Sequence, residues 1–455
     1  QYENILSLSV KGTAVLLNKD TIIQQYPDVF QGTGKFENKY HLTVDPDAVP
    51  VIHPPRTIPI ALRNELKEEL DRLQSEGILI EVTEPTPWVS SMVIARKSSG
   101  KLRICIDPKE LNKVIRRSHY PIPTIDEILP DLSEVKVFSV FDVRNGFWHV
   151  ELDEESSKLT TFITPFGRYR WLRMPFGLTS APEEFQRRQH HVVEGLPGVI
   201  AIHDDILVVG KGKTQEEAQL DHDRNVHALM IRCRERNMKL NAEKVKLGCK
   251  EIPFIGHVLT ASGLKPDPQK VKAILEMPNP TNLAAVRRII GFVNYLHKFV
   301  PHLSEICEPL RKLTHKDAPW QWGEAQQQAF DDMKHLVSEI TILQYYQPDQ
   351  DLTLQCDASE KGLGAVITQN GRPIAFASRA LSHVEIKYAQ IEKELLAVIF
   401  GLEKFRQYTY GRLVQVQSDH KPLASILKKP LYLAPRRLQR MLLRLQGYEI
   451  NLVYR

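Results

Sequence analysis

Three aspartates occupy runs of the sequence that otherwise favour buried strands. Asp142 ends the β-rich run 137–143, and Asp204 and Asp205 interrupt the apolar run 199–209. Burying an ionised carboxylate is costly unless it is paired or binds a metal. A hairpin with two aspartates beside a strand with a third would therefore gather divalent cations, and two cations about 3.5–4 Å apart stabilise the attacking and leaving oxygens of in-line phosphoryl transfer. The alternative, a solvated turn that contains Asp-Asp, is weakened but not removed by the apolar residues on both sides.

A second set of acids lies in the C-terminal part of the chain. Asp357 ends an alternating run that starts at Leu352, and Asp419 follows another strand-like run. Glu394 shares a helix face with Ile391 and later apolar residues, because positions three and four apart lie together on a helix. Each acid taken singly is typical of a surface charge, but a glutamate among apolar neighbours is unusual.

Hydrophobic periodicity predicts the elements that position the first set. Leucines at 62, 66, 70 and 73 predict a helix that ends at Gly77. The apolar runs 89–96 and 102–106 predict a hairpin with a basic tip at 97–101. The Pro-rich stretch before them indicates an extended lead-in.

The pattern changes after about residue 265. Apolar stripes at 283–296 and 330–337 predict helices, and strands return from Leu352. Asn370-Gly371 between apolar runs predicts a tight hairpin, and a long helix is expected over 388–405.

Composition adds weaker constraints. The 455 residues carry a net charge of +5 and are 42% hydrophobic, as in a protein with real cores. No run of about 18 apolar residues occurs, so no membrane partner is expected. The five cysteines lack metal-ligand spacing and are interpreted as reduced thiols of an intracellular protein. The first residue is not Met, which suggests a piece of a longer polypeptide.

Five segments between residues 94 and 260 carry a family resemblance by their order and content. They are KLRICID at 101–107, KELNK at 109–113, FDVRNGF at 141–147, TPFGRYRWLRMPFGLTSAP at 164–182 and IHDDI at 202–206. Together they resemble the fingers and palm of reverse transcriptases, specifically those of gypsy-type long-terminal-repeat retrotransposons. The implied activity is RNA-directed, and also DNA-directed, DNA polymerisation at a primer 3′-hydroxyl.

The resemblance also implies roles for individual residues. Asp142, Asp204 and Asp205 would be catalytic and hold two Mg²⁺, with Mn²⁺ as an alternative. The nucleotide-binding residues would be Lys101 and Arg103 on the triphosphate, Phe147 excluding a 2′-hydroxyl, and Phe176 and Gly177 in the pocket. The primer grip would be Phe254, Ile255 and Gly256. Ile202 and His203 depart from the aromatic and small or apolar residues usual before the two aspartates, which puts full polymerase activity in doubt.

The C-terminal acids gain a role from a second resemblance. Asp357-Ala-Ser, Glu394-Leu-Leu-Ala and Ser418-Asp419-His-Lys resemble the ribonuclease H domain of the same elements. That family cleaves RNA in an RNA–DNA hybrid, so Asp357, Glu394 and Asp419 would be catalytic and bind two metal ions. Its fourth acid normally lies beyond the strand that reaches residue 455, so we expect cleavage to be weak.

The expected fold is α/β (α+β): a right-hand polymerase of fingers, palm and thumb, followed by a ribonuclease H-like α/β domain. The expected segments are an extended lead-in at 1–57, fingers and palm at 58–265, a helical thumb at 266–345 and an incomplete ribonuclease H-like domain at 346–455. Basic thumb residues would contact duplex phosphates without recognising sequence: Lys270, Lys272, Arg287, Arg288, Lys298, Arg311 and Lys312.

The implied partners are a primed RNA or DNA template, deoxynucleoside triphosphates and an RNA–DNA hybrid. Family analogy adds a protease and an integrase in the same polyprotein and a cytoplasmic retroelement particle, and it leaves a homodimer open. Two alternatives remain: a domesticated or decayed copy that binds nucleic acid without catalysis, and an RNA-templated RNA polymerase. Phe147 and the ribonuclease H resemblance argue against the second.

Overall fold

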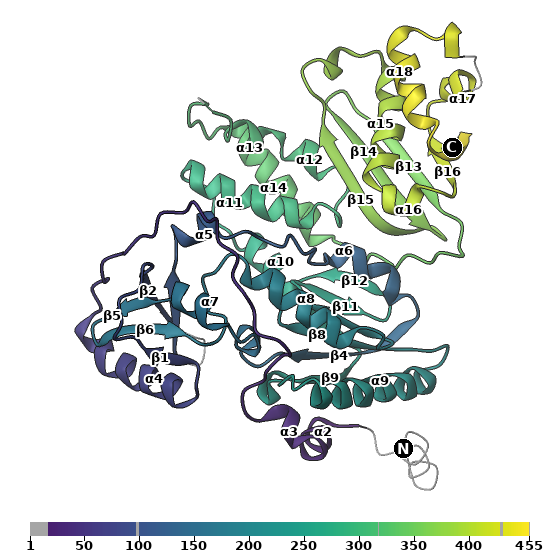
Figure 1. Ribbon diagram of the computed structural model, residues 1–455. Coiled ribbons are helices and arrows are strands. Elements are labelled where there is room, and N and C mark those ends of the chain that lie inside the picture. Colours follow the sequence, from purple (N-terminus) through teal and green to yellow (C-terminus); the bar gives the residue numbers. More distant parts are fainter. Residues whose placement is uncertain (1–16, 97–99, 317, 428–430, 455) are drawn as a thin grey trace. The chain divides into compact units, whose positions relative to one another are not determined.

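The computed structural model describes residues 17–96, 100–316, 318–427 and 431–454 (Figure 1). The chain forms two compact units. The first takes in the described residues up to Ile128 and Glu134–Ile252, and the second takes in Leu129–Ser133 and the described residues from Pro253 onward.

The first unit begins with two short helices, α2 (Lys19–Gln25) and α3 (Pro27–Phe30). The prediction of an extended lead-in is therefore wrong for these residues, while residues 1–16 lie outside the described part. Asn18 caps α2 with a reciprocal bond to Thr21, and Pro27 opens α3, where its missing N–H costs nothing. Isolated bridges from residues 40, 44 and 52 then pair an extended segment with the rest of the unit.

A five-stranded sheet in the order β1-β6-β5-β2-β3 follows. The predicted helix is confirmed as α4, with Leu66, Leu70 and Leu73 buried, and Gly77 beyond its end has a φ of 68°. The predicted hairpin is confirmed as β2 and β3, although residues 97–99 of its tip lie outside the described residues. The bounds are α4 (Arg63–Ser75), β1 (Leu79–Glu81), β2 (Ser90–Arg96), β3 (Leu102–Asp107), β5 (Phe162–Thr164) and β6 (Gly167–Trp171).

The second sheet of this unit has the order β7-β8-β4-β9. Helix α9 contacts β8 and β4, and α8 contacts β7 and α9. The bounds are β4 (Val135–Asp142), β7 (Val199–Ile202), β8 (Asp205–Lys211), β9 (Lys246–Cys249), α8 (Ala181–Val193) and α9 (Gln215–Glu235). Shorter helices connect these elements: η1 (Ile60–Leu62), α5 (Leu111–Val114), α6 (Ile125–Ile128), η3 (Gly146–His149), α7 (Glu154–Leu159) and η4 (Ala242–Lys244).

Helices and a small sheet form the first part of the second unit. Val286, Ile289, Val293 and Leu296 are buried on α11, which confirms the predicted stripe. The bounds are η2 (Leu129–Leu132), β10 (Glu251–Phe254), β11 (His257–Thr260), β12 (Gly263–Pro266), α10 (Pro268–Leu275), α11 (Leu283–Leu296), α12 (Leu303–Ile306), α13 (Glu308–Lys312) and α14 (Glu324–Ser338).

The rest of the second unit is a five-stranded sheet in the order β15-β14-β13-β16-β17. β13, β14 and β15 are antiparallel neighbours, whereas β16 runs parallel to β13 and to β17. Asn370 and Gly371, with φ of 50° and 74°, form the predicted tight turn between β14 and β15. The bounds are β13 (Thr353–Ala358), β14 (Gly362–Gln369), β15 (Arg372–Ala380), η5 (Glu385–Lys387), α15 (Gln390–Lys404), α16 (Arg406–Thr409), β16 (Leu413–Ser418), α17 (Pro422–Leu427), η6 (Leu431–Leu433), α18 (Arg436–Leu445) and β17 (Glu449–Tyr454).

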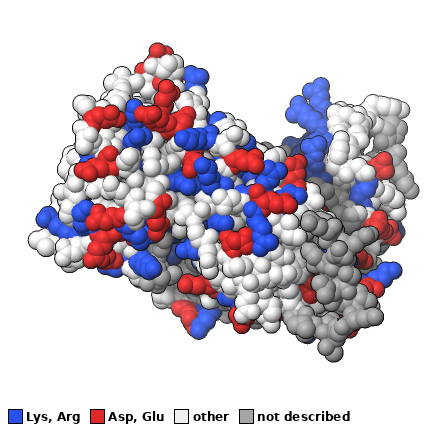
Figure 2. Space-filling model, turned by 60° about the horizontal axis from the view of Figure 1, so that its bottom comes forward, with Lys and Arg blue, Asp and Glu red and all other residues white. Residues whose placement is uncertain are grey.

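Two properties of the whole chain bear on function. All five cysteines are unpaired, as expected. In the described ranges, no helix combines the length and apolar character needed to cross a bilayer. Basic and acidic side chains are interspersed over the face shown in Figure 2, so charge alone marks no single binding tract there.

Candidate active sites

The sheet of the first unit brings the three aspartates of the first set together. β4 and β8 are antiparallel, and their register pairs Asp142 directly with Asp205. Asp204 lies in the turn between β7 and β8, and its carbonyl accepts a hydrogen bond from the Val143 N–H at 2.8 Å. The predicted convergence of these aspartates is confirmed, while their role in metal binding stays a prediction.

Electrostatics at this cluster favours a cation. Burial, followed by the charges of Asp142 and Asp205, raises the pKa of Asp204, although the residue as a whole is exposed. Burial and Asp142 likewise raise the pKa of Asp205. The Lys244 ammonium lies 2.7 Å from an Asp142 oxygen. One ammonium leaves negative charge among three carboxylates, so their oxygens fit Mg²⁺, which prefers oxygen ligands.

The turn that departs from the family pattern is well ordered by its neighbours. His203 has a φ of 53°, a left-handed conformation in which His is enriched among non-glycine residues. Its N–H donates to the buried Gln186 amide oxygen at 2.7 Å, and Gln186 also donates to the Ala201 carbonyl at 2.8 Å. Ile202 is buried and His203 is exposed. The fold therefore accommodates the imidazole in solvent without displacing the turn.

Four of the five predicted nucleotide-binding residues lie together. The Arg103 guanidinium lies 4.8 Å from the centre of the Phe176 ring, and the Phe147 and Phe176 ring centres are 5.1 Å apart. Gly177 has a φ of 115°, and a Cβ there would lie 2.1 Å from the Ile106 carbonyl oxygen, so only glycine fits. Lys101 precedes β3 with an exposed side chain, and no contact places it with this group in the described part.

Gly146 connects this aromatic group to the acids. It precedes Phe147 in η3, and a Cβ on it would lie 2.6 Å from an Asp204 carboxylate oxygen and 2.8 Å from the Phe185 ring. The Phe147 and Phe185 ring centres are 5.7 Å apart. A wall of arginine and aromatic rings therefore lies beside a cluster of carboxylates.

The predicted primer grip forms a hairpin turn. Phe254 ends β10 with its ring buried, and Ile255 and Gly256 have φ of 44° and 70°. The Gly256 carbonyl accepts a hydrogen bond from the Tyr295 hydroxyl at 2.5 Å. This turn begins the second unit, so its role beside the acids of the first unit remains a prediction.

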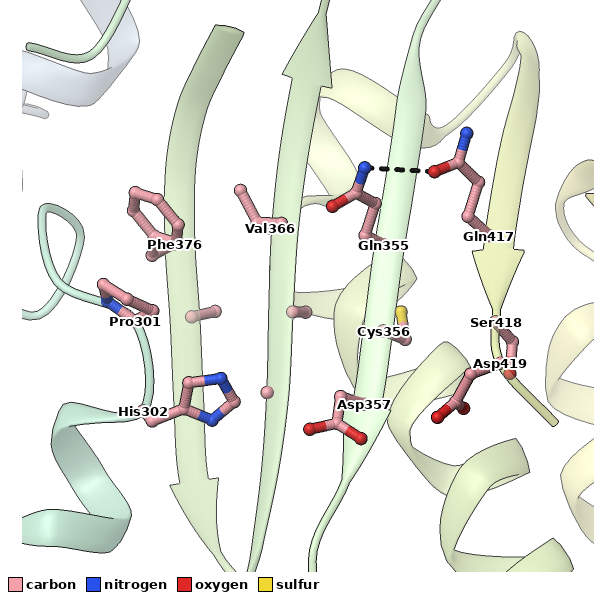
Figure 3. Close-up of a pocket in the computed structure, with 13 residues that line it drawn as sticks. Pro301, His302, Gln355, Cys356, Asp357, Val366, Phe376, Gln417, Ser418 and Asp419 are labelled. Carbon is pink, nitrogen blue, oxygen red and sulfur yellow. Dashed lines mark hydrogen bonds between the residues drawn. The ribbon is translucent and has the colours of Figure 1, made fainter. Parts of the chain in front are cut away.

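The acids of the second set also converge. Asp357 near the end of β13, Glu394 on α15 and Asp419 just after β16 each place a carboxylate oxygen within 4.8 Å of the others. Asp357 and Asp419 converge because β13 and β16 are parallel neighbours with Gln355 opposite Gln417. Asp357, Asp419 and His302 line a cavity of about 300 Å³, and Figure 3 shows the two aspartates side by side.

Glu394 gives the strongest sign of a cation site. It is 4% exposed, and burial, followed by Asp419 and Asp357, raises its pKa to about 7 despite a hydrogen bond from Gln390. Within the described residues, the second carboxylate oxygen of Glu394 is buried without a hydrogen-bond partner. A buried oxygen without a donor is costly, and a divalent cation would satisfy it.

This raised pKa predicts a pH dependence of the metal-free protein. Because folding raises the pKa of Glu394 from 4.5 to about 7, its contribution to stability is fully present below pH 4.5 and is lost as the pH rises through about 7. We expect Glu394→Gln to raise the Tm over wild type at pH 8 but not at pH 4.5, corresponding to about 1–3 kcal/mol. Calorimetry in EDTA checks this, with exposed Glu360→Gln as the control. An equal offset at both pH values would contradict it.

Several residues around these sites were not predicted from the sequence. Lys244 bonds to Asp142 of the first cluster, Gln186 bonds to His203 in the adjacent turn, and His302, the residue before α12, lines the cavity of the second cluster. No periodicity or spacing marks them. Asn112 lies in the recognised KELNK segment, but the motif alone gave it no role.

Two parts of the chain match known protein families. Residues 94–259 match the family described as reverse transcriptase (RNA-dependent DNA polymerase). Residues 322–416 match the RNase H-like domain found in reverse transcriptase. This second match includes α14, which the sequence analysis grouped with the preceding helices.

Curated relatives are Pol polyproteins of retrotransposons. The retrovirus-related Pol polyprotein from transposon 297 of Drosophila melanogaster is 34% identical over 398 residues, which cover 86% of this chain and 37% of that polyprotein. The one from transposon gypsy of the same organism is 31% identical over 379 residues, covering 79% and 36%. The chain thus spans little more than a third of the length of these relatives.

Solved structures show the same fold. A foamy viral protease-reverse transcriptase in complex with double-stranded DNA is 22% identical with a TM-score of 0.85, covering 96% of this chain and 77% of that one. Another, in complex with an RNA/DNA hybrid, is 22% identical with a TM-score of 0.79, covering 96% and 60%. The chain combines a reverse transcriptase domain with an RNase H-like domain and belongs to the reverse transcriptases of gypsy-type retrotransposon Pol polyproteins.

Proposed function

We propose that the chain is an RNA- and DNA-directed DNA polymerase that extends a primer by two-metal nucleotidyl transfer. The observation that carries this proposal is the convergence of Asp142, Asp204 and Asp205 beside the wall formed by Arg103, Phe147 and Phe176. This arrangement suits a deoxynucleoside triphosphate. The Arg103 guanidinium can pair with its negatively charged phosphates, and the aromatic rings can pack against its base and sugar.

Different side chains would have different roles in nucleotidyl transfer. Asp142, Asp204 and Asp205 would hold two Mg²⁺ or Mn²⁺, which supply charge stabilisation for the attacking and leaving oxygens. Arg103 would form a fork with triphosphate oxygens while its guanidinium stays next to the Phe176 ring. Lys244 holds the Asp142 carboxylate in place at 2.7 Å before substrate binds. Lys101 would add positive charge near the triphosphate, and Phe254, Ile255 and Gly256 would position the primer end.

The second cluster supports an accompanying hydrolytic activity. We propose that Asp357, Glu394 and Asp419 hold the metal ions for cleavage of RNA in an RNA–DNA hybrid. Each places a carboxylate oxygen within 4.8 Å of the others, and one Glu394 oxygen has no donor among the described residues. The foamy viral enzymes bound to double-stranded DNA and to an RNA/DNA hybrid make these duplexes the substrates to test.

The remaining assignments follow from this function. The proposed segments are a lead-in at 1–57, fingers and palm at 58–265, a thumb at 266–345 and the ribonuclease H-like domain at 346–455. The basic thumb side chains would bind phosphates, so affinity for duplex should fall with salt. By analogy with the Pol relatives, a protease and an integrase share the polyprotein, and the setting is a cytoplasmic retroelement particle. Self-association as a homodimer is one further arrangement to measure.

Primer extension tests the polymerase proposal. A labelled DNA primer on an RNA or a DNA template, with Mg²⁺ and deoxynucleotides, should be extended in a template-directed manner. Extension with ribonucleotides alone would indicate an RNA polymerase. Duplex binding without incorporation of either nucleotide would favour a copy that has lost catalysis.

Phe147 should control the choice of sugar. We expect Phe147→Ala to increase ribonucleotide incorporation relative to deoxynucleotide incorporation by about 10–100-fold, because removing the ring opens space for a 2′-hydroxyl, and a steric difference of about 1–3 kcal/mol corresponds to this range. The ratio of kcat/KM for the two nucleotides measures it. Phe166→Ala, on the turn after β5, is the matched control and should leave the ratio unchanged. A ratio unaffected by Phe147→Ala would remove this role.

A further inference from the structure

Asn112 on α5 makes hydrogen bonds through both ends of its side-chain amide to one distant segment. Its Nδ2 donates to the Gly177 carbonyl at 2.9 Å. Its Oδ1 accepts from the Thr179 N–H at 3.0 Å and from the Thr179 hydroxyl at 3.3 Å. The side chain thus pairs with the backbone as a neighbouring strand would, across 65 residues of sequence.

The helix that carries Asn112 is itself well anchored. Leu111 is 1% exposed in the core of the first unit, and the Asn112 N–H donates to the Pro108 carbonyl at 2.8 Å. Only residues 108–110 separate α5 from β3, so Asn112 is held close to the strand that carries Arg103.

The segment that Asn112 contacts includes Phe176, part of the wall proposed to bind the nucleotide. From the other side, the Ile106 N–H donates to the Phe176 carbonyl at 3.1 Å, and Gly177 packs so closely on Ile106 that no side chain would fit. Residues 176–179 are therefore clamped between β3 and α5. With the clamp in place, the Phe176 ring lies next to both the Arg103 guanidinium and the Phe147 ring.

We propose that Asn112 is a positioning residue that fixes the Phe176–Thr179 segment, and with it the wall against which the incoming deoxynucleoside triphosphate binds. The inference rests on the proposed polymerase function and extends it to a residue that touches neither substrate nor metal. Loss of the amide nitrogen leaves the Gly177 carbonyl without its donor, and loss of the amide oxygen leaves the Thr179 N–H without its acceptor. The segment is then less firmly held, and the Phe176 ring no longer keeps its position next to Arg103. Nucleotide binding should weaken while primer–template binding stays the same.

Three variants separate the two ends of the amide from general effects on folding. Asn112→Ala removes both, whereas Asn112→Asp keeps the acceptor for Thr179 and loses the donor to Gly177. Lys113→Ala is the matched control on the same helix, because the Lys113 ammonium pairs with Glu110 at 2.7 Å instead. The full chain is used throughout.

The main measurement is the Kd of a deoxynucleoside triphosphate in a complex with a primer–template whose primer ends in a dideoxynucleotide. We expect Asn112→Ala to raise this Kd about 5–20-fold, Asn112→Asp to raise it less, and Lys113→Ala to leave it within about twofold, since a lost hydrogen bond commonly costs up to about tenfold. The Kd for primer–template should stay within about twofold in all three. An equal rise for Lys113→Ala, or a parallel loss of primer–template binding, would overturn the positioning role.

Hydrogen exchange of the nucleotide-free protein provides a second readout. The Thr179 amide should exchange at least about tenfold faster in Asn112→Ala than in wild type or Lys113→Ala. Unchanged exchange would overturn the clamp. If wild type binds no nucleotide, the proposed polymerase function fails and the pocket role with it, whereas Thr179 exchange still decides whether Asn112 holds the segment.

Discussion

Asp204→Asn should abolish primer extension and at the same time stabilise the metal-free protein. We expect kcat/KM to fall at least about 10³-fold, because losing one ligand from a two-metal site removes several kcal/mol of charge stabilisation in the transition state. The Tm in EDTA should rise by about 1–3 °C. Burial and the neighbouring carboxylates raise the pKa of Asp204, so its ionised form opposes folding.

The sign of the stability effect follows from that raised pKa. A group whose pKa is higher in the folded state contributes stability below its ordinary value of 3.8, and the contribution is lost as the pH rises through the folded value. Asparagine does not ionise, so Asp204→Asn avoids this loss of stability at higher pH. The gain should therefore be present at pH 7, absent near pH 3.5 and smaller in salt, since Asp204 is an exposed residue.

Two further measurements test whether these effects are specific to Asp204 and to metal binding. Asp47→Asn changes an exposed aspartate of the same unit and should alter neither extension nor Tm. Adding Mg²⁺ should raise the Tm of wild type more than that of Asp204→Asn, because binding to the folded state alone stabilises it. Extension by Asp204→Asn within tenfold of wild type would remove this residue from the catalytic site.

Asp357→Asn should have the second largest effect and should separate the two activities. We expect hybrid cleavage to fall by at least about 10²–10³-fold relative to wild type, because one of three converging carboxylates is lost. Primer extension on a DNA template should stay within about twofold. Asp357 is exposed, so the fold should tolerate an isosteric amide.

A gel assay with an RNA–DNA hybrid labelled on the RNA strand measures the cleavage, and calorimetric titration with Mn²⁺ measures ion binding directly. Asp349→Asn, an exposed aspartate shortly before β13, is the matched control. Cleavage equal to wild type, or wild-type Mn²⁺ binding at this cluster, would contradict the assignment of Asp357.

Local sequence signals determined much of this architecture. The leucine stripe of α4, the Asn370-Gly371 turn and the alternation that leads to Asp357 depend on contacts between near neighbours, so periodicity and turn chemistry are sufficient to place them. The ordered motifs identified the family and its acids. The helices α2 and α3 were missed because they have only seven and four residues, and helices so short depend on burial of residues such as Ile22 and Phe30.

The sequence by itself predicted which acids converge, because residue types and the order of motifs can be read without a fold. Only the tertiary structure decided what surrounds them. Lys244 reaches Asp142 across 102 residues, and Asn112 reaches Gly177 across 65. The pKa of Glu394 depends on burial and on acids from two other elements. Such properties arise from chain segments that meet only after folding, and no local pattern records their distance or their exclusion of water.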